Sequence, residues 1–154
     1  MFYFAYGSNM DWDQIKERCP SARFVGTAVL RDYRLAFTRK SVNRGCGVSD
    51  AVPDDGKVVW GVVFEIHGPD VGRLNVAEGY RPGRTKNAYW RKECHVLMNG
   101  DEKQPMTVMT YFGDPQENPP LPNSNYKNLL LSGARRWQLP EAYIKQLESI
   151  VVAE

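Results

Sequence analysis

Cysteine and histidine are scarce in this sequence. Three cysteines, Cys19, Cys46 and Cys94, are widely spaced among 154 residues. An odd number at such spacing fits neither a disulfide framework nor a metal cluster. The two histidines, His67 and His95, have no His-Glu-x-x-His or Cys-x-x-Cys neighbour, so zinc ligation has no recognisable motif here. We therefore expect reduced thiols and no metal site.

Long apolar runs are also missing. No apolar stretch reaches the roughly 18 residues that a membrane-spanning helix needs. The first residues, Met-Phe-Tyr-Phe, lack the basic region, apolar region and cleavage site of a secretory signal. The sequence predicts a soluble cytoplasmic protein that does not bind membranes.

Neither sign of charge dominates the chain. Lys and Arg number 20 against 18 Asp and Glu, which leaves a net charge of +2. That charge is too small for a protein that binds nucleic acid by neutralising many phosphates. Local basic clusters are ordinarily solvated surface, and together they are weak evidence for a carboxylated ligand. The clusters are Arg39-Lys40 with Arg44, Arg81 with Arg84 and Lys86, Arg91-Lys92, and Arg135-Arg136.

Composition is otherwise that of an ordinary globular domain. Hydrophobic residues make up 42% and charged residues 25% of the chain, both typical values. A chain of this length buries about two thirds of its unfolded surface, so it needs neither disulfide nor metal to fold. We expect one domain over residues 1–154. The oligomeric state is not specified, and a homodimer stays open.

Hydrophobic periodicity predicts strands first and two helices last. The strands are expected to pair mostly antiparallel through short connections, which gives an α+β fold. Strands are predicted at residues 1–6, 24–30, 34–38, 47–51, 58–66, 89–98 and 105–112, with turns at 31–33, 53–56 and 99–102. Helices are predicted at residues 11–19, at 70–78 between Pro69 and Gly79, at 126–137 and at 140–152.

Residues 4–10, Phe-Ala-Tyr-Gly-Ser-Asn-Met, are the most informative segment. An aromatic strand runs into a glycine turn and then into residues that cap helices. The first amides of a helix have no intrahelical acceptor, and the helix dipole adds positive potential there. Such a loop can hold a carboxylate, a phosphate or a developing oxyanion. An ordinary strand-to-helix connection, with Gly7 in the turn and Ser8, Asn9 or Asp11 as the helix cap, would contain the same residues.

Glu78 is placed against the usual electrostatic preference. It falls at the C-terminus of the predicted helix that Gly79 ends, where the negative end of the dipole disfavours a carboxylate by about 0.3 to 1 kcal/mol. Local rules tend to be broken at functional sites. This position therefore makes Glu78 a candidate for proton transfer.

Motifs for other chemistries are missing. The segment around Gly7 has neither Gly-x-Gly-x-x-Gly spacing nor a following Gly-Lys-Ser/Thr, so nucleotide binding is not expected. No Gly-x-Ser-x-Gly elbow is present, and Ser8 is better interpreted as a capping residue than as a nucleophile.

Four motifs, in this order, resemble the γ-glutamylcyclotransferase-like family. The resemblance extends over nearly the whole chain and implies a small mixed, mostly antiparallel β-barrel or curled sheet with flanking helices. The motifs are Tyr6-Gly7-Ser8-Asn9, Glu78-Gly79, Pro119-Pro120-Leu121-Pro122, and a tail with Tyr126-Lys127, Gly133-Ala134 and Leu139-Pro140-Glu141-Ala142-Tyr143.

The resemblance also implies a reaction. The free α-amine of a γ-glutamyl group attacks its own side-chain carbonyl, which gives 5-oxoproline and releases an amino acid or amine, without any cofactor. Glu78 would be the general acid and base, and the amides of Tyr6, Gly7, Ser8 and Asn9 would hold the oxyanion or the substrate carboxylate. Tyr89, Tyr111 and Tyr126 would line the pocket, although each taken singly is a common core or rim aromatic.

The chain departs from the family pattern beside Glu78. The segment before the acid usually has Leu-Asp-x-x-Glu-Gly, whereas this chain has Leu74-Asn75-Val76-Ala77-Glu78-Gly79. Loss of a neighbouring acid leaves Glu78 less repelled and changes its pKa. The basic segment that follows, residues 80–88, is either a lid over the leaving group or a solvated loop.

Two further functions stay open at this stage. The first is a non-catalytic module that binds a γ-glutamyl or carboxylate compound with the same loop and has lost efficient chemistry. The second, an RNA-binding accessory domain, rests only on scattered Arg and Tyr residues. The leaving group and the pathway are not specified.

Overall fold

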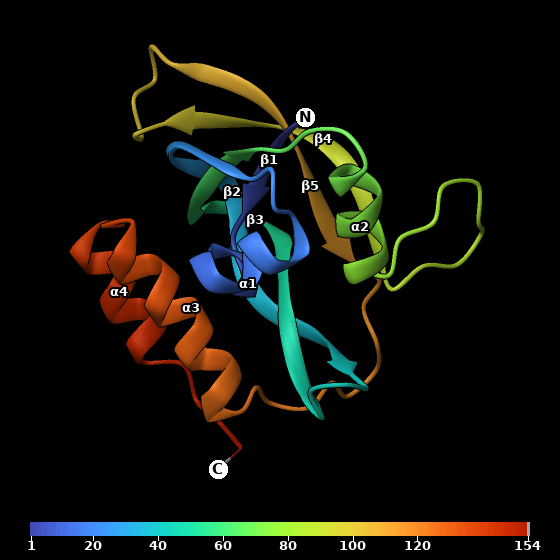
Figure 1. Cartoon of the computed structure of the whole chain (residues 1–154). Coiled ribbons are helices and arrows are strands. Elements are labelled where there is room, and N and C mark those ends of the chain that lie inside the picture. Colours follow the sequence, from blue (N-terminus) through green and yellow to red (C-terminus); the bar gives the residue numbers. More distant parts are fainter. Residues whose placement is uncertain (154) are drawn as a thin grey trace.

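Five strands close into a barrel in the computed structural model, which describes residues 1–153 (Figure 1). Neighbours follow the order β1-β3-β2-β4-β5, and every pair is antiparallel except the β1–β5 pair, where Tyr3 is opposite Met109. The predicted α+β fold with a small, mostly antiparallel barrel is confirmed. The strands are β1 (Phe2–Ala5), β2 (Arg23–Ser41), β3 (Cys46–Glu65), β4 (Tyr89–Met98) and β5 (Pro105–Gly113).

The strands β2 and β3 form one long hairpin that turns at residues 42–45. The predicted breaks at residues 31–33 and 53–56 are wrong, because the segments on either side of each break belong to one strand. Asp32 adopts a φ of 66° and its carboxylate accepts a hydrogen bond from Gly56 N (3.1 Å). The register shifts between Arg31 and Tyr33, so the extra residues are absorbed as a bulge instead of a turn.

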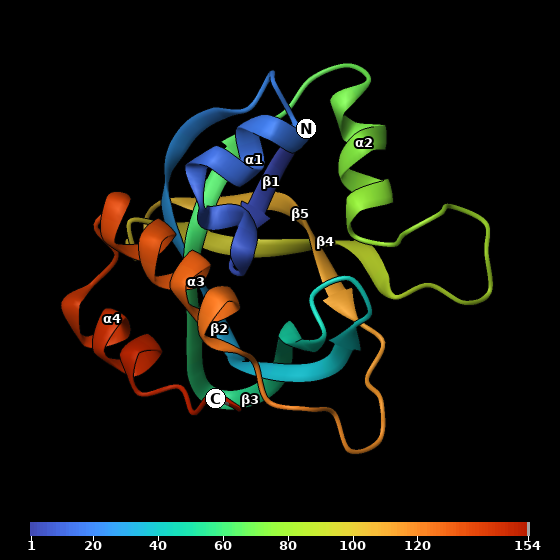
Figure 2. The same ribbon diagram turned by 60° about the horizontal axis from the view of Figure 1, so that its bottom comes forward.

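Within residues 1–153, four α-helices flank the barrel. Helices α3 and α4 lie side by side on one side and α2 lies on the other, with α1 between them (Figures 1 and 2). Among residues 1–153, no helix is long and apolar enough to cross a membrane. The helices are α1 (Trp12–Arg18), α2 (Asp70–Ala77), α3 (Ser124–Arg136) and α4 (Glu141–Glu148), and the short 3₁₀ helix η1 (Ser8–Met10) precedes α1.

Two helix ends differ from the sequence prediction by more than one residue. Helix α3 begins two residues early because the Asn123 side chain accepts a hydrogen bond from Tyr126 N (2.9 Å) and caps it. Helix α4 ends at Glu148 instead of continuing to residue 152. Lys127 Nζ donates to the carbonyls of Glu148 (2.6 Å) and Ile150 (2.9 Å), and these contacts hold the last carbonyls outside a continuing helix.

Strand β1 separates two apolar cores. Phe4 packs inside the barrel with Val59, Val63 and other strand residues, whereas Tyr3 and Ala5 face the core that lies under the helices. This alternation follows from the two-residue period of a strand. Strand β1 therefore ends at the boundary between the barrel and the helices, and a pocket lies at this boundary.

Candidate active site

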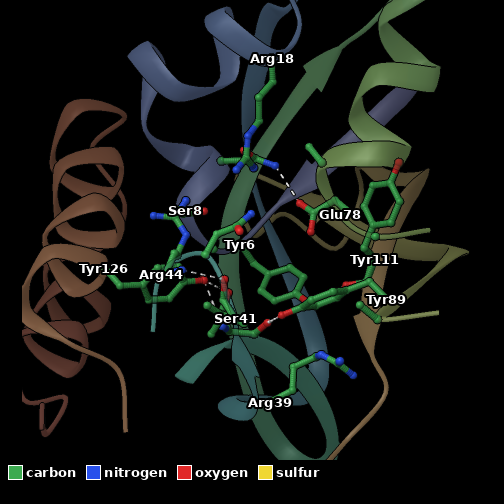
Figure 3. Close-up of a pocket in the computed structure, with 18 of the residues that line it drawn as sticks. Tyr6, Ser8, Arg18, Arg39, Ser41, Arg44, Glu78, Tyr89, Tyr111 and Tyr126 are labelled. Carbon is green, nitrogen blue, oxygen red and sulfur yellow. Dashed lines mark hydrogen bonds between the residues drawn. The ribbon is translucent and has the colours of Figure 1, made fainter. Parts of the chain in front are cut away.

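A pocket of about 460 Å³ opens where β1 runs into η1, opposite the C-terminus of α2 and beside the tip of the β2–β3 hairpin (Figure 3). The volume is typical of small-molecule sites. All eight residues that the sequence analysis proposed for the site line this pocket: Tyr6, Gly7, Ser8, Asn9, Glu78, Tyr89, Tyr111 and Tyr126.

The loop after β1 is held by close backbone packing. A Cβ atom on Gly7 would lie 2.2 Å from Ser49 Oγ, so only glycine leaves room for β3 at this point. On the other side, a Cβ on Gly133 would lie 2.4 Å from Met10 Cβ, and Trp137 Nε1 donates to Met10 O (2.9 Å). The loop is thus fixed between the sheet and helix α3.

The amides of this loop precede the first hydrogen bonds of the helical turn. Met10 N donates to Gly7 O (3.1 Å) and Asp11 N to Ser8 O (3.0 Å). The Asp11 side chain, which accepts from Gln14 N (3.1 Å), caps α1 itself. The amides of Gly7, Ser8 and Asn9 therefore come before the first residue whose amide donates a helical hydrogen bond, as at any helix start. These three residues line the pocket.

Glu78 is the C-cap residue of α2, as the sequence predicted for the helix end. Gly79 adopts a φ of 66° and turns the chain away, as glycine commonly does after a helix. The Glu78 carboxylate is half-buried and accepts a hydrogen bond from Asn9 Nδ2 at 2.8 Å. The acid and the β1–η1 loop, which are 69 residues apart in sequence, meet directly.

The pKa of Glu78 is raised above the ordinary carboxyl value. Burial is the main cause, and the positive charges of Arg18 and Arg44 and the Tyr3 hydroxyl act in the opposite direction. The negative end of the α2 dipole adds to the upward effect. A carboxyl group with a raised pKa is better matched to accepting and returning a proton near neutral pH.

A polar network that the sequence analysis missed positions Asn9. Its Oδ1 accepts from Gln14 Nε2 (2.9 Å) and Arg18 NH1 (2.9 Å), while Nδ2 also donates to Tyr3 OH (3.0 Å). Arg44 NH2 in turn donates to Gln14 Oε1 (2.7 Å). Gln14 and Arg18 are four residues apart on one face of α1, and that spacing was the available signal.

The four predicted tyrosines contribute walls whose hydroxyls already have protein partners. Tyr6 OH donates to Tyr111 O (2.5 Å) and Tyr111 OH to Asn75 Oδ1 (2.6 Å). Tyr89 OH donates to Ser49 O (2.6 Å), and Tyr126 OH bonds with both Ser49 N (3.0 Å) and Ser49 Oγ (2.8 Å). The rings are therefore rigidly placed around the loop.

Asn75, which replaces the usual acid, and the basic segment after Glu78 have different surroundings. Asn75 accepts from Tyr111 OH and, at 3.4 Å, from Arg91 NH1, so its side chain supports a pocket wall. The loop between α2 and β4 extends away from the barrel (Figure 2). Of residues 79–88, only Gly79 and Ala88 line the pocket, and in this conformation the basic residues of the loop do not cover it.

Of the basic clusters seen in the sequence, one lies at the pocket. Arg39, Lys40 and Arg44 line it together with Arg18. The clusters at residues 81–86, 91–92 and 135–136 are not part of its lining. The pocket is thus enriched in positive charge, which suits a ligand with carboxylate groups.

Comparison with known proteins gives one consistent result. The model of the family described as gamma-glutamyl cyclotransferase, AIG2-like, matches residues 3–129. The gamma-glutamylcyclotransferases of Bos taurus and Homo sapiens are each 32% identical to this chain over 152 residues, which cover 96% of it and 77% of the relative. A solved structure titled gamma-glutamyl cyclotransferase superposes with a TM-score of 0.89 at 29% identity and covers 99% of this chain and 89% of its own.

Proposed function

This chain belongs to the gamma-glutamyl cyclotransferase, AIG2-like family, and from that premise we propose that it converts a γ-glutamyl amino acid or γ-glutamyl amine into 5-oxoproline and a free amine. Its relatives make it an enzyme of the gamma-glutamylcyclotransferase class. The alternative of a non-catalytic binding module therefore loses its support.

Glu78 is the proposed general acid and base. The α-ammonium of the γ-glutamyl group is not a nucleophile until it loses a proton, and the ionised Glu78 carboxylate accepts that proton. The freed amine attacks its own side-chain carbonyl carbon. When the tetrahedral intermediate collapses, the C–N bond to the leaving group breaks, and Glu78 returns the proton to the departing nitrogen. The ring nitrogen loses its second proton to water, and the released amine takes up a proton from water to leave as an ammonium. The carboxylate is ionised again at the end of the cycle.

The amides of the β1–η1 loop are the proposed donors to the oxyanion. They precede the first helical hydrogen bonds and belong to a segment that packs against Ser49 and Gly133. Fixed donors of this kind contribute about 3 to 4 kcal/mol each to the stabilisation of a transition state. The same amides, with Arg18 and Arg44, are also within the region where the substrate α-carboxylate must lie if its α-ammonium contacts Glu78.

The reaction needs no second substrate. Attack occurs within one γ-glutamyl unit, so the pocket mainly has to hold a flexible chain with its amine close to its carbonyl. The tyrosine rings, which are fixed by hydrogen bonds to Ser49, Asn75 and the Tyr111 backbone, provide rigid walls for this. No cofactor is required for the steps proposed.

One observation carries the proposal. Asn9 Nδ2 donates a hydrogen bond of 2.8 Å to Glu78 Oε1 inside the pocket, and this contact joins the β1–η1 loop to the acid at the end of α2. The test is a mass-spectrometric assay for 5-oxoproline after incubation with a panel of γ-glutamyl dipeptides and γ-glutamyl amines. Enzyme-dependent 5-oxoproline with stoichiometric release of the amine supports the proposal. A panel without any product contradicts it for these substrates.

The pH dependence of the reaction provides a further prediction. Because Glu78 must be ionised to accept a proton, kcat/KM should fall at pH values below its raised pKa. Arg18 lowers that pKa, so Arg18→Met should raise it and move the acid limb of the kcat/KM profile to higher pH. Activity relative to wild type should then be lower at about pH 6 than at about pH 8.

The matched control for this experiment is Arg18→Lys, which keeps the positive charge. Its acid limb should lie closer to that of the wild type. Equal displacement of the limb in both variants would show that the hydrogen bond to Asn9, and not the charge, controls Glu78. An acid limb at the same pH in Arg18→Met and wild type would contradict the prediction.

A further inference from the structure

The charges around the pocket are unbalanced. Four cationic side chains line it, Arg18, Arg39, Lys40 and Arg44, against one carboxylate, Glu78. Among residues 1–153, none of these four cations forms an ion pair within 4.0 Å with a carboxylate. Cations that no carboxylate neutralises in a pocket are available to negative groups of a ligand.

These cations divide into two groups. Arg18 and Arg44 act on the charge of Glu78, since both lower its pKa. Arg39 acts on Tyr89, whose pKa it lowers against a larger upward effect of burial. Figure 3 shows Arg39 at the end of the site opposite Arg18 and Glu78, with Tyr6 and Tyr89 between them. The pocket therefore has one cationic end beside the acid and another remote from it.

The backbone around Arg39 is firmly anchored. The Arg39 side chain donates from NH1 to Asp114 O (2.7 Å). On either side of Arg39, Thr38 O accepts from Gln116 N (2.8 Å) and Lys40 N donates to Gln116 Oε1 (2.7 Å). The chain after β5 thus fixes the end of β2, and one arm of the guanidinium, while the other nitrogens of the planar fork remain for a second partner.

The buried acid of the neighbouring strand β3, Asp50, does not pair with Arg39. Asp50 accepts hydrogen bonds from Thr38 Oγ1 (2.7 Å) and Gly113 N (2.8 Å), and it forms no ion pair with Arg39. Arg39 thus lines the pocket with a charge that no carboxylate of residues 1–153 neutralises through an ion pair.

The chemistry of a γ-glutamyl amino acid fits this division. Its α-ammonium and α-carboxylate share one carbon, so both lie at the Glu78 end when the ammonium contacts Glu78. The leaving amino acid carries a second carboxylate, beyond the scissile amide and away from that carbon. We propose that Arg39 binds this second carboxylate, so that the enzyme selects γ-glutamyl amino acids over γ-glutamyl compounds whose leaving group is uncharged. This inference rests on the function proposed above.

The test compares two substrates that differ only in that charge, γ-glutamyl-alanine and γ-glutamyl-alaninamide. The wild type should show a kcat/KM for the acid that exceeds that for the amide by about 10- to 100-fold, the effect of one hydrogen-bonded charge. In Arg39→Gln the ratio of the two kcat/KM values should fall toward one, mainly through a higher KM for the acid. Arg39→Lys should restore part of the ratio, since it keeps the charge but not the planar fork.

Arg34→Gln is the matched control on the same strand, because Arg34 pairs with Asp54 (3.3 Å) and does not line the pocket. Its ratio should equal that of the wild type. A wild type without preference for the acid overturns the inference and leaves the proposed function intact, and this outcome does not depend on whether any variant folds. An Arg39→Gln variant that loses both activities equally also overturns it, whereas a wild type that makes 5-oxoproline from neither compound overturns both proposals.

Discussion

Glu78→Gln is expected to lower kcat/KM for γ-glutamyl substrates by about 100- to 10,000-fold, the usual contribution of a general acid and base. The amide has nearly the same shape, and its Oε1 can still accept the hydrogen bond from Asn9 Nδ2 that the carboxylate accepts at 2.8 Å. What it loses is the ability to take and return a proton. Steady-state formation of 5-oxoproline, measured by mass spectrometry, gives the value. Turnover equal to that of the wild type would place the base on another residue.

The same variant carries its own folding control. The folded-state pKa of Glu78 is raised by burial, so its ionised form opposes folding, and the stability present below the unfolded pKa is lost as the pH rises through the folded pKa. Glu78→Gln should therefore have a Tm at pH 7 that is equal to or higher than that of the wild type. The difference should shrink as the pH is lowered toward about 4, the ordinary carboxyl pKa. A large fall in Tm at pH 7 would mean that lost activity reflects lost structure.

Gly7→Ala is expected to lower kcat/KM by about 100-fold, the scale that accompanies a misplacement of about 1 Å at a reacting centre. The φ angle of Gly7 is −113°, which other residues adopt, so the effect arises from space and not from backbone strain. The added Cβ would lie 2.2 Å from Ser49 Oγ. The loop must therefore move away from β3, and its amides move with it.

Ser49→Ala supplies the matching rescue. It removes Oγ, and the next atoms that the new Cβ of Gly7→Ala meets are Ser49 Cβ and the Tyr126 hydroxyl oxygen, both at 3.4 Å. The Tyr126 hydroxyl keeps its hydrogen bond from Ser49 N (3.0 Å). Gly7→Ala combined with Ser49→Ala should thus recover most of the activity that Gly7→Ala loses. Equal activity in the single and double variants would show that contact with Ser49 is not the cause.

Local chemistry was sufficient to predict the parts of the site that single segments determine. The capping residues after Gly7 specify a turn, and the glycine after Glu78 specifies a helix end. Both depend on local residues and not on the tertiary fold. A barrel or curled sheet was expected from the family resemblance alone, because periodicity shows that strands form but not which strands are neighbours.

Long-range pairing accounts for what the sequence did not show. Residues 53–56 and Asp32 have ordinary turn chemistry, yet pairing of β2 with β3 along their length incorporates both as irregularities of one hairpin. Gln14 and Arg18 were missed because the helix spacing shows that they share a face but not that this face meets Asn9. Arg39 belonged to a cluster already seen, and only the fold separates it from the basic clusters that lie elsewhere.

The position of β1 in the barrel also bears on how the enzyme folds. This first strand lies between β3 and β5, with Phe2 opposite Glu65 and Tyr3 opposite Met109, so one of its partners, β5, is the last strand to be synthesised. Contacts between such distant segments require the closure of long loops and form slowly. The loop that follows β1 can take its place only when the barrel closes. We therefore expect catalytic competence to arise late in folding, when the barrel closes.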